Sequence, residues 1–78
     1  MPRHPRVSGK DTVSALKRAG FVVFDQGGSH VYLHGCDAGI CGPRVIVPVH
    51  GTRILAPLTL KHILDASGLS LPRFTSLL

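Results

Sequence analysis

Two short segments in which apolar and polar residues alternate constrain the fold of this chain more than any other feature. His30–His34 places two apolar residues on one side and two histidines and a tyrosine on the other, and Arg44–His50 alternates in the same way around three valines. Alternation with a period of two is typical of strands that bury one face and leave the other in water. The run Phe21–Phe24, which ends at an Asp-Gln-Gly-Gly turn, predicts a third strand.

Helical patterns lie on both sides of these strands. Ser8, with an acidic residue three positions later, resembles a capping box at the start of a helix from about Lys10 to Ala19. Pro57 suits the first turn of a second helix that Gly68 ends, and Ser70 is placed to cap a last short helix. The order α-β-β-β-α-α predicts an α+β fold of two layers, with the helices on one face of a three-stranded antiparallel sheet.

The chain of 78 residues has room for one compact domain. Residues 8–78 are expected to form it, after a basic, flexible N-terminal arm at residues 1–7. The segment Gly35–Pro43 is interpreted as a long loop between the second and third strands. The longest apolar runs, Phe21–Phe24 and Val45–Val49, are too short to span a membrane, so a cytoplasmic protein without membrane contact is expected.

The net charge of +5 suggests a polyanionic partner, with nucleic acid the first candidate. If the valines of both alternating strands share the buried face, a pairing of Val31 with Val49 sets His30 opposite His50. Histidines and an arginine would then surround a small apolar strip on the wet face.

An imidazole in that position can take the proton from a ribose 2′-hydroxyl, and a nearby cation can stabilise the phosphorane that forms. Cleavage by this route needs no metal or other cofactor and gives a 2′,3′-cyclic phosphate and a 5′-hydroxyl. The 2′-hydroxyl requirement restricts the substrate to RNA. The backbone of Gly28 and Ser29, which precede His30, can approach a phosphate closely and offer amide donors.

The order of several short motifs over about residues 8–78 resembles the HicA, or YcfA-like, family of mRNA interferase toxins. The motifs are Ser8-Gly-Lys-Asp, Lys17-Arg-Ala-Gly-Phe21, Gly28-Ser-His30, Val47-Pro-Val-His-Gly51, Leu55–Leu60, Ile63-Leu64 and Ala66-Ser-Gly-Leu69. The resemblance implies a double-stranded-RNA-binding-domain-like fold and cleavage of mRNA without a metal. It also implies neutralisation by a cognate HicB antitoxin as partner.

The same resemblance implies roles for individual residues. His30 of Gly28-Ser29-His30 matches the catalytic histidine of the family, and His50 matches a histidine whose role is less settled. The sequence departs from the family pattern in the long segment Gly35–Pro43, in Leu58 where glycine is common, and in lacking an acidic residue after Leu71.

Two further groups of residues have competing interpretations. Cys36 and Cys41, with His34 nearby, suggest a zinc site or a loop disulfide, but two free thiols and no metal are the expectation. Lys10, Lys17 and Arg18 on the first helix are candidate phosphate contacts, against the alternative of a solvated helix face.

Two other functions compete with the nuclease. The first is a non-catalytic RNA-binding module, which the charge and the fold class favour. The second is a protein-interaction domain that binds its partner through Tyr32, Ile46 and Pro48.

Overall fold

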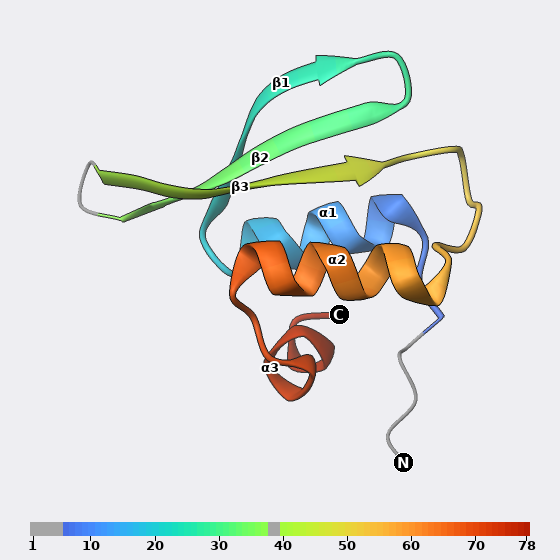
Figure 1. The fold of residues 1–78 in the computed structure, drawn as a ribbon. Coiled ribbons are helices and arrows are strands. Elements are labelled where there is room, and N and C mark those ends of the chain that lie inside the picture. Colours follow the sequence, from blue (N-terminus) through green and yellow to red (C-terminus); the bar gives the residue numbers. More distant parts are fainter. Residues whose placement is uncertain (1–5, 38–39) are drawn as a thin grey trace.

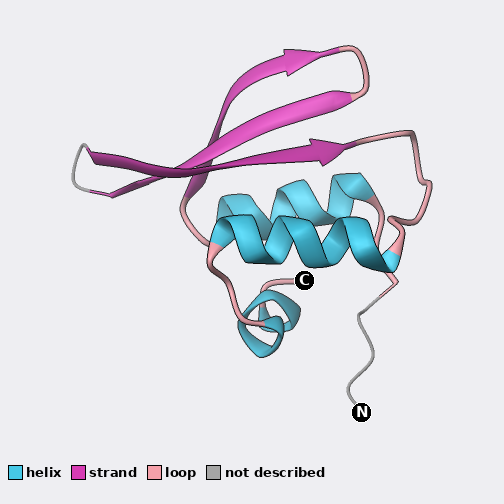
Figure 2. Cartoon of the chain, in the orientation of Figure 1, coloured by secondary structure: helices cyan, strands magenta, loops and turns pink. Residues whose placement is uncertain are grey.

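The computed structural model describes residues 6–37 and 40–78, apart from the side chains at 36, 37, 40 and 41. The elements, in chain order, are α1 (Gly9–Arg18), β1 (Phe21–Gly27), β2 (His30–Asp37), β3 (Ile40–Pro48), α2 (Pro57–Ser67) and α3 (Leu71–Ser76). The strands form one antiparallel sheet in the order β1-β2-β3. Helices α1 and α2 lie side by side under one face of the sheet, and α3 lies below them (Figures 1 and 2).

The architecture confirms the predicted α+β class and is consistent with a double-stranded-RNA-binding-domain-like fold. Between the sheet and the two long helices lies a cluster formed by Leu16, Phe21, Val31, Leu33, Val45, Val47 and Ile63. A second cluster, Val7, Ala15, Leu60, Leu64 and Phe74, lies where α3 meets the other side of the helices. The third helix therefore adds a layer to the two that the sequence predicted.

The helix boundaries follow the predicted caps closely. The Ser8 hydroxyl accepts a hydrogen bond from the Asp11 amide at 3.1 Å, and the Thr12 hydroxyl donates to the Ser8 carbonyl at 2.9 Å. Gly68, with a φ of +76°, ends α2 in the left-handed conformation, and the Ser70 hydroxyl accepts from the Arg73 amide at 3.3 Å. Val7, which the sequence placed in the arm, is buried, and its carbonyl accepts from the Leu55 amide at 2.8 Å.

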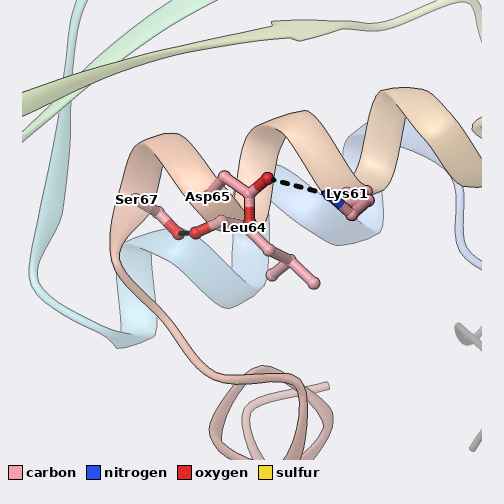
Figure 3. Close-up of polar contacts among 4 residues, drawn as sticks. All are labelled: Lys61, Leu64, Asp65 and Ser67. Atoms are coloured by element: carbon pink, nitrogen blue, oxygen red, sulfur yellow. Dashed lines mark hydrogen bonds and ion pairs between the residues drawn. The ribbon is translucent and has the colours of Figure 1, made fainter.

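The C-terminal turn of α2 is fixed by its own polar side chains (Figure 3). The buried Ser67 hydroxyl donates to the Leu64 carbonyl at 2.9 Å and accepts from the Leu69 amide at 3.2 Å. Lys61 and Asp65, one turn apart on the exposed side, form an ion pair at 3.4 Å. The Ser67 bonds direct the chain from α2 into α3.

The strand register differs from the predicted one by two residues. His30 pairs with Pro48, and Val31 pairs with Val47, so the pairing of His30 with His50 was wrong. A slip of two residues keeps every side chain on its own face, and the alternation of apolar residues therefore cannot distinguish the two registers. The predicted buried face of each strand is confirmed, since Val31, Leu33, Val45 and Val47 are buried. β3 lies at one edge of the sheet.

All three strands are longer than predicted, and most of the segment Gly35–Pro43 belongs to β2 and β3. β2 continues to Asp37 and β3 begins at Ile40, with an irregularity in the pairing between His34 and Cys36. β1 likewise continues to Gly27 through a second irregularity, between Val23 and Asp25. The glycines and proline that indicated a loop accompany β-bulges, which such residues also favour.

Candidate functional site

His30 is the first residue of the central strand and is held by backbone pairing on both sides. It pairs with Gly27 across a turn made by Gly28 and Ser29, and with Pro48 on the opposite strand. Gly28 has a φ of +57°, which favours glycine, and a side chain added there would meet open space. The Ser29 carbonyl accepts from the Val49 amide at 2.6 Å, which ties the turn to the end of β3.

The His30 side chain is exposed and belongs to the sheet face away from the helices. Its neighbours along the strand, Val31 and Leu33, are buried, so His30 shares the outer face with Tyr32 and His34. An exposed imidazole on a doubly paired strand is accessible to a large substrate while its backbone is held in place.

The first turn of α1 reaches the same end of the sheet. A Cβ at Gly9 would overlap the Pro48 carbonyl, so the helix start lies directly against the strand residue that pairs with His30. Lys10, the next residue, is exposed. The positive end of the helix dipole and the Lys10 ammonium add positive potential at this end of the molecule, which the Asp11 carboxylate in the same turn partly offsets.

His50 lies two residues beyond the end of β3, at this same end of the sheet. It is exposed and lines a shallow surface pocket with Arg53 and Thr59, among others. The Arg53 amide donates to the His50 carbonyl at 3.0 Å, which closes the turn that follows β3. Arg53 is a cation at this end that the sequence analysis did not single out, although it follows His50 by only three residues.

The predicted site residues thus fall into two groups. Gly28, Ser29, His30, Lys10 and His50 come from the β1–β2 turn with the start of β2, from the start of α1 and from the loop after β3, and these segments all lie at one end of the molecule (Figure 1). Lys17 and Arg18 lie at the other end of α1, roughly 11 Å from Lys10 along the helix axis. The Arg18 guanidinium donates to the Leu77 carbonyl at 2.6 Å, which links α1 to the C-terminal residues.

A ring cluster on the outer sheet face was only partly foreseen from the sequence. The Phe24 ring lies with its centroid 4.6 Å from that of His34 and 6.3 Å from that of Tyr32. The Arg44 guanidinium lies over the same ring, 5.8 Å from its centroid. The continuous run Phe21–Phe24 gave no face for Phe24, and the irregularity that follows Val23 was not visible in the sequence.

Cys36 and Cys41 are backbone partners across β2 and β3. Their side chains lie outside the described part of the structure. The zinc, disulfide and free-thiol interpretations depend on those side chains and stay predictions. His34, the third residue of the zinc interpretation, has its ring against Phe24. Within the described part of the chain, no helix is long and apolar enough to cross a membrane.

Comparison with known proteins adds an independent finding to this geometry. Residues 9–69 match the family described as the HicA toxin of bacterial toxin-antitoxin systems, whereas no curated protein matches the chain. The matched region includes α1, the whole sheet and α2, and it contains Gly28, Ser29, His30 and His50. The chain belongs to the HicA toxin family of bacterial toxin–antitoxin systems.

Proposed function

We propose that this protein is an endoribonuclease that cleaves mRNA without a metal and uses His30 as its general base. The observation that carries the proposal is the exposed imidazole at the start of the doubly paired strand β2, within the Gly28-Ser29-His30 turn of a HicA family chain. The proposal includes a cytoplasmic location, because mRNA is the substrate.

In the proposed reaction, a His30 ring nitrogen takes the proton from a ribose 2′-hydroxyl. The 2′-oxygen attacks the adjacent phosphorus, the bond from phosphorus to the 5′-oxygen breaks, and that oxygen receives a proton as it leaves. The products are a 2′,3′-cyclic phosphate and a 5′-hydroxyl. The attacking group belongs to the substrate, so the chain has to supply proton transfer and charge stabilisation only.

Cations and amide dipoles at the same end of the molecule support the charge stabilisation. The phosphorane carries more negative charge than the phosphodiester, so the start of α1 and the Lys10 ammonium favour the transition state. Arg53 and His50, at the pocket beyond β3, are further candidates for phosphate contacts. Gly28 leaves room above the turn for a phosphate to approach the backbone.

A partner follows from the family. A toxin of a toxin–antitoxin pair is held inactive by its antitoxin, and we propose a HicB antitoxin as the protein that neutralises this chain. Co-expression with a cognate HicB antitoxin is expected to relieve growth arrest and to block RNA cleavage by the purified complex.

The central test is RNA cleavage by purified wild-type protein and by the His30→Ala variant in buffer with EDTA, with the product ends mapped. The wild type is expected to give 2′,3′-cyclic phosphate ends, and His30→Ala is expected to bind RNA without cleaving it. His62→Ala removes an exposed histidine on α2 and serves as the control with wild-type cleavage. RNA that is bound but left intact by the wild type would instead support a non-catalytic RNA-binding module.

A further inference from the structure

The outer face of the sheet carries an aromatic side chain that the fold itself does not need. Of the three phenylalanines, Phe21 and Phe74 are buried at 8 % and 0 % exposure, whereas Phe24 is 44 % exposed. The pairing of β1 with β2 passes from Val23 to Asp25, so Phe24 occupies the extra position of a bulge. Bulges re-aim side chains near functional sites, and this one keeps a large apolar ring in water.

The rings around Phe24 support one another. The His34 ring makes an interplanar angle of 40° with the Phe24 ring, and the Tyr32 ring makes an angle of 54° with it. Arg44 covers part of the Phe24 ring, which holds a guanidinium beside the rings. Because all four come from paired strands, the cluster needs little ordering before it binds a ligand.

A cluster of tilted aromatic rings with a guanidinium over one of them fits an unpaired nucleobase and its phosphate. Nucleobases stack on aromatic and guanidinium planes, and small sheets that display such rings bind single-stranded RNA in this way. The net charge of +5 favours a polyanion over an apolar protein surface. Asp25 pairs with Tyr32 on the β1 side, so phosphates are expected on the β3 side, where Arg44 lies.

The cluster continues directly into the proposed cleavage site. Tyr32 follows His30 on the outer face of β2, about 6.7 Å further along the strand. An RNA strand that lies along β2 can therefore place a 2′-hydroxyl at His30 while a neighbouring base rests on Tyr32 and Phe24. We propose that Phe24, Tyr32, His34 and Arg44 form a stacking platform for unpaired bases of the RNA substrate. This inference rests on the proposed function of His30 and extends it by naming a substrate contact.

The platform has a built-in probe, since Tyr32 is the only tyrosine and the chain has no tryptophan. The experiment titrates a single-stranded 2′-O-methyl oligouridylate, which lacks the hydroxyl needed for cleavage, and follows Tyr32 fluorescence. We expect quenching on binding. Phe24→Ala is expected to weaken binding at least about fivefold, the effect of losing one base stack. An oligonucleotide with abasic positions is expected to bind the wild type correspondingly less well.

Val22→Ala is the matched control, because Val22 is an exposed apolar residue on β1 without a ring. Three results would overturn the platform. The first is equal affinity of wild type and Phe24→Ala for the oligonucleotide, and the second is an equal loss of affinity in Phe24→Ala and Val22→Ala. The third is equal affinity of the wild type for abasic and base-bearing oligonucleotides. A Phe24→Ala variant that binds RNA normally but no longer binds the antitoxin also overturns it, and assigns the face to a protein partner. Circular dichroism of both variants establishes that they are folded.

The outcome is separable from that of the cleavage test. If wild type binds and quenches but leaves natural RNA intact, the nuclease proposal fails and the platform stands as an RNA-binding surface. If wild type cleaves and Phe24→Ala cleaves and binds equally well, only the platform fails.

Discussion

Gly9 lies so close to the carbonyl of Pro48 that a Cβ at position 9 would overlap the carbonyl oxygen. This contact seats the first turn of α1 on the strand residue that pairs with His30. The start of α1 can approach the end of β3 this closely because residue 9 has no Cβ atom. The contact also explains why the sequence has glycine at the first position of a helix, where glycine otherwise lowers helix stability.

Gly9→Ala is therefore expected to destabilise the protein by about 1–3 kcal/mol, because α1 or the end of β3 must move to make room. Urea unfolding followed by circular dichroism measures the loss. Gly27→Ala is the control, since a Cβ at Gly27 meets nothing within 4 Å. Its stability is expected to stay within about 0.5 kcal/mol of wild type. Equal stability of the two variants would show that the contact at Gly9 is not tight.

Phe74→Ala tests the layer that α3 adds. The ring is fully buried among residues of α1 and α2, and its removal is expected to cost about 3–5 kcal/mol. A loss of this size is a large part of the stability of a small domain, so the thermal midpoint is expected to fall sharply. Leu78→Ala, at a residue 45 % exposed, is expected to change the midpoint little. An unchanged midpoint for Phe74→Ala would mean that α3 is not required for folding.

His30 and His50 are expected to differ in their effect on RNA cleavage. His30→Ala is expected to lower the cleavage rate about 10²- to 10⁴-fold, the usual contribution of a general base. His50 lies beyond Pro48 and not opposite His30. The decrease in cleavage rate for His50→Ala is therefore expected to be at least about tenfold smaller than the decrease for His30→Ala. Initial rates on a defined RNA compare the two variants. Equal losses would indicate that the two imidazoles work as a pair.

Lys10 and Lys17 lie at opposite ends of α1 and are expected to affect different kinetic constants. Lys10→Gln is expected to lower kcat as well as affinity, because Lys10 lies at the end of the molecule that holds His30. Lys17→Gln is expected to weaken binding with kcat unchanged, and to reduce the salt dependence of binding by about one phosphate contact. A fall in kcat for Lys17→Gln equal to that for Lys10→Gln would contradict this division.

The helices and the faces of the strands could be predicted because their signals are local. Ser8, Gly68 and Ser70 begin or end helices through bonds and dihedral angles that each residue provides by itself. The alternation around Val31 and Val45 likewise separates buried from exposed positions without knowledge of the partner strand.

The register and the bulges could not be predicted because they depend on pairs of strands. A shift of two residues between β2 and β3 exchanges one valine pair for another, whereas the packing of Gly9 against Pro48 and the bond from Val49 to Ser29 exist in the observed pairing. The exposure of Phe24 follows from the bulge in β1, which is a relation between two strands. The roles of Gly28, Ser29, His30 and His50 therefore stay predictions, and it is their arrangement at one end of the sheet, together with Arg53, that the structure adds.

The position of β2 between β1 and β3 has a consequence for motion near the site. Amide hydrogens of an inner strand exchange with solvent only after a neighbouring strand has separated, so this strand frays last. Deuterium uptake is expected to be slower along β2 than along β1, even though the His30 ring is in water. The imidazole is then expected to keep its place while the edge strands on either side of it open and close.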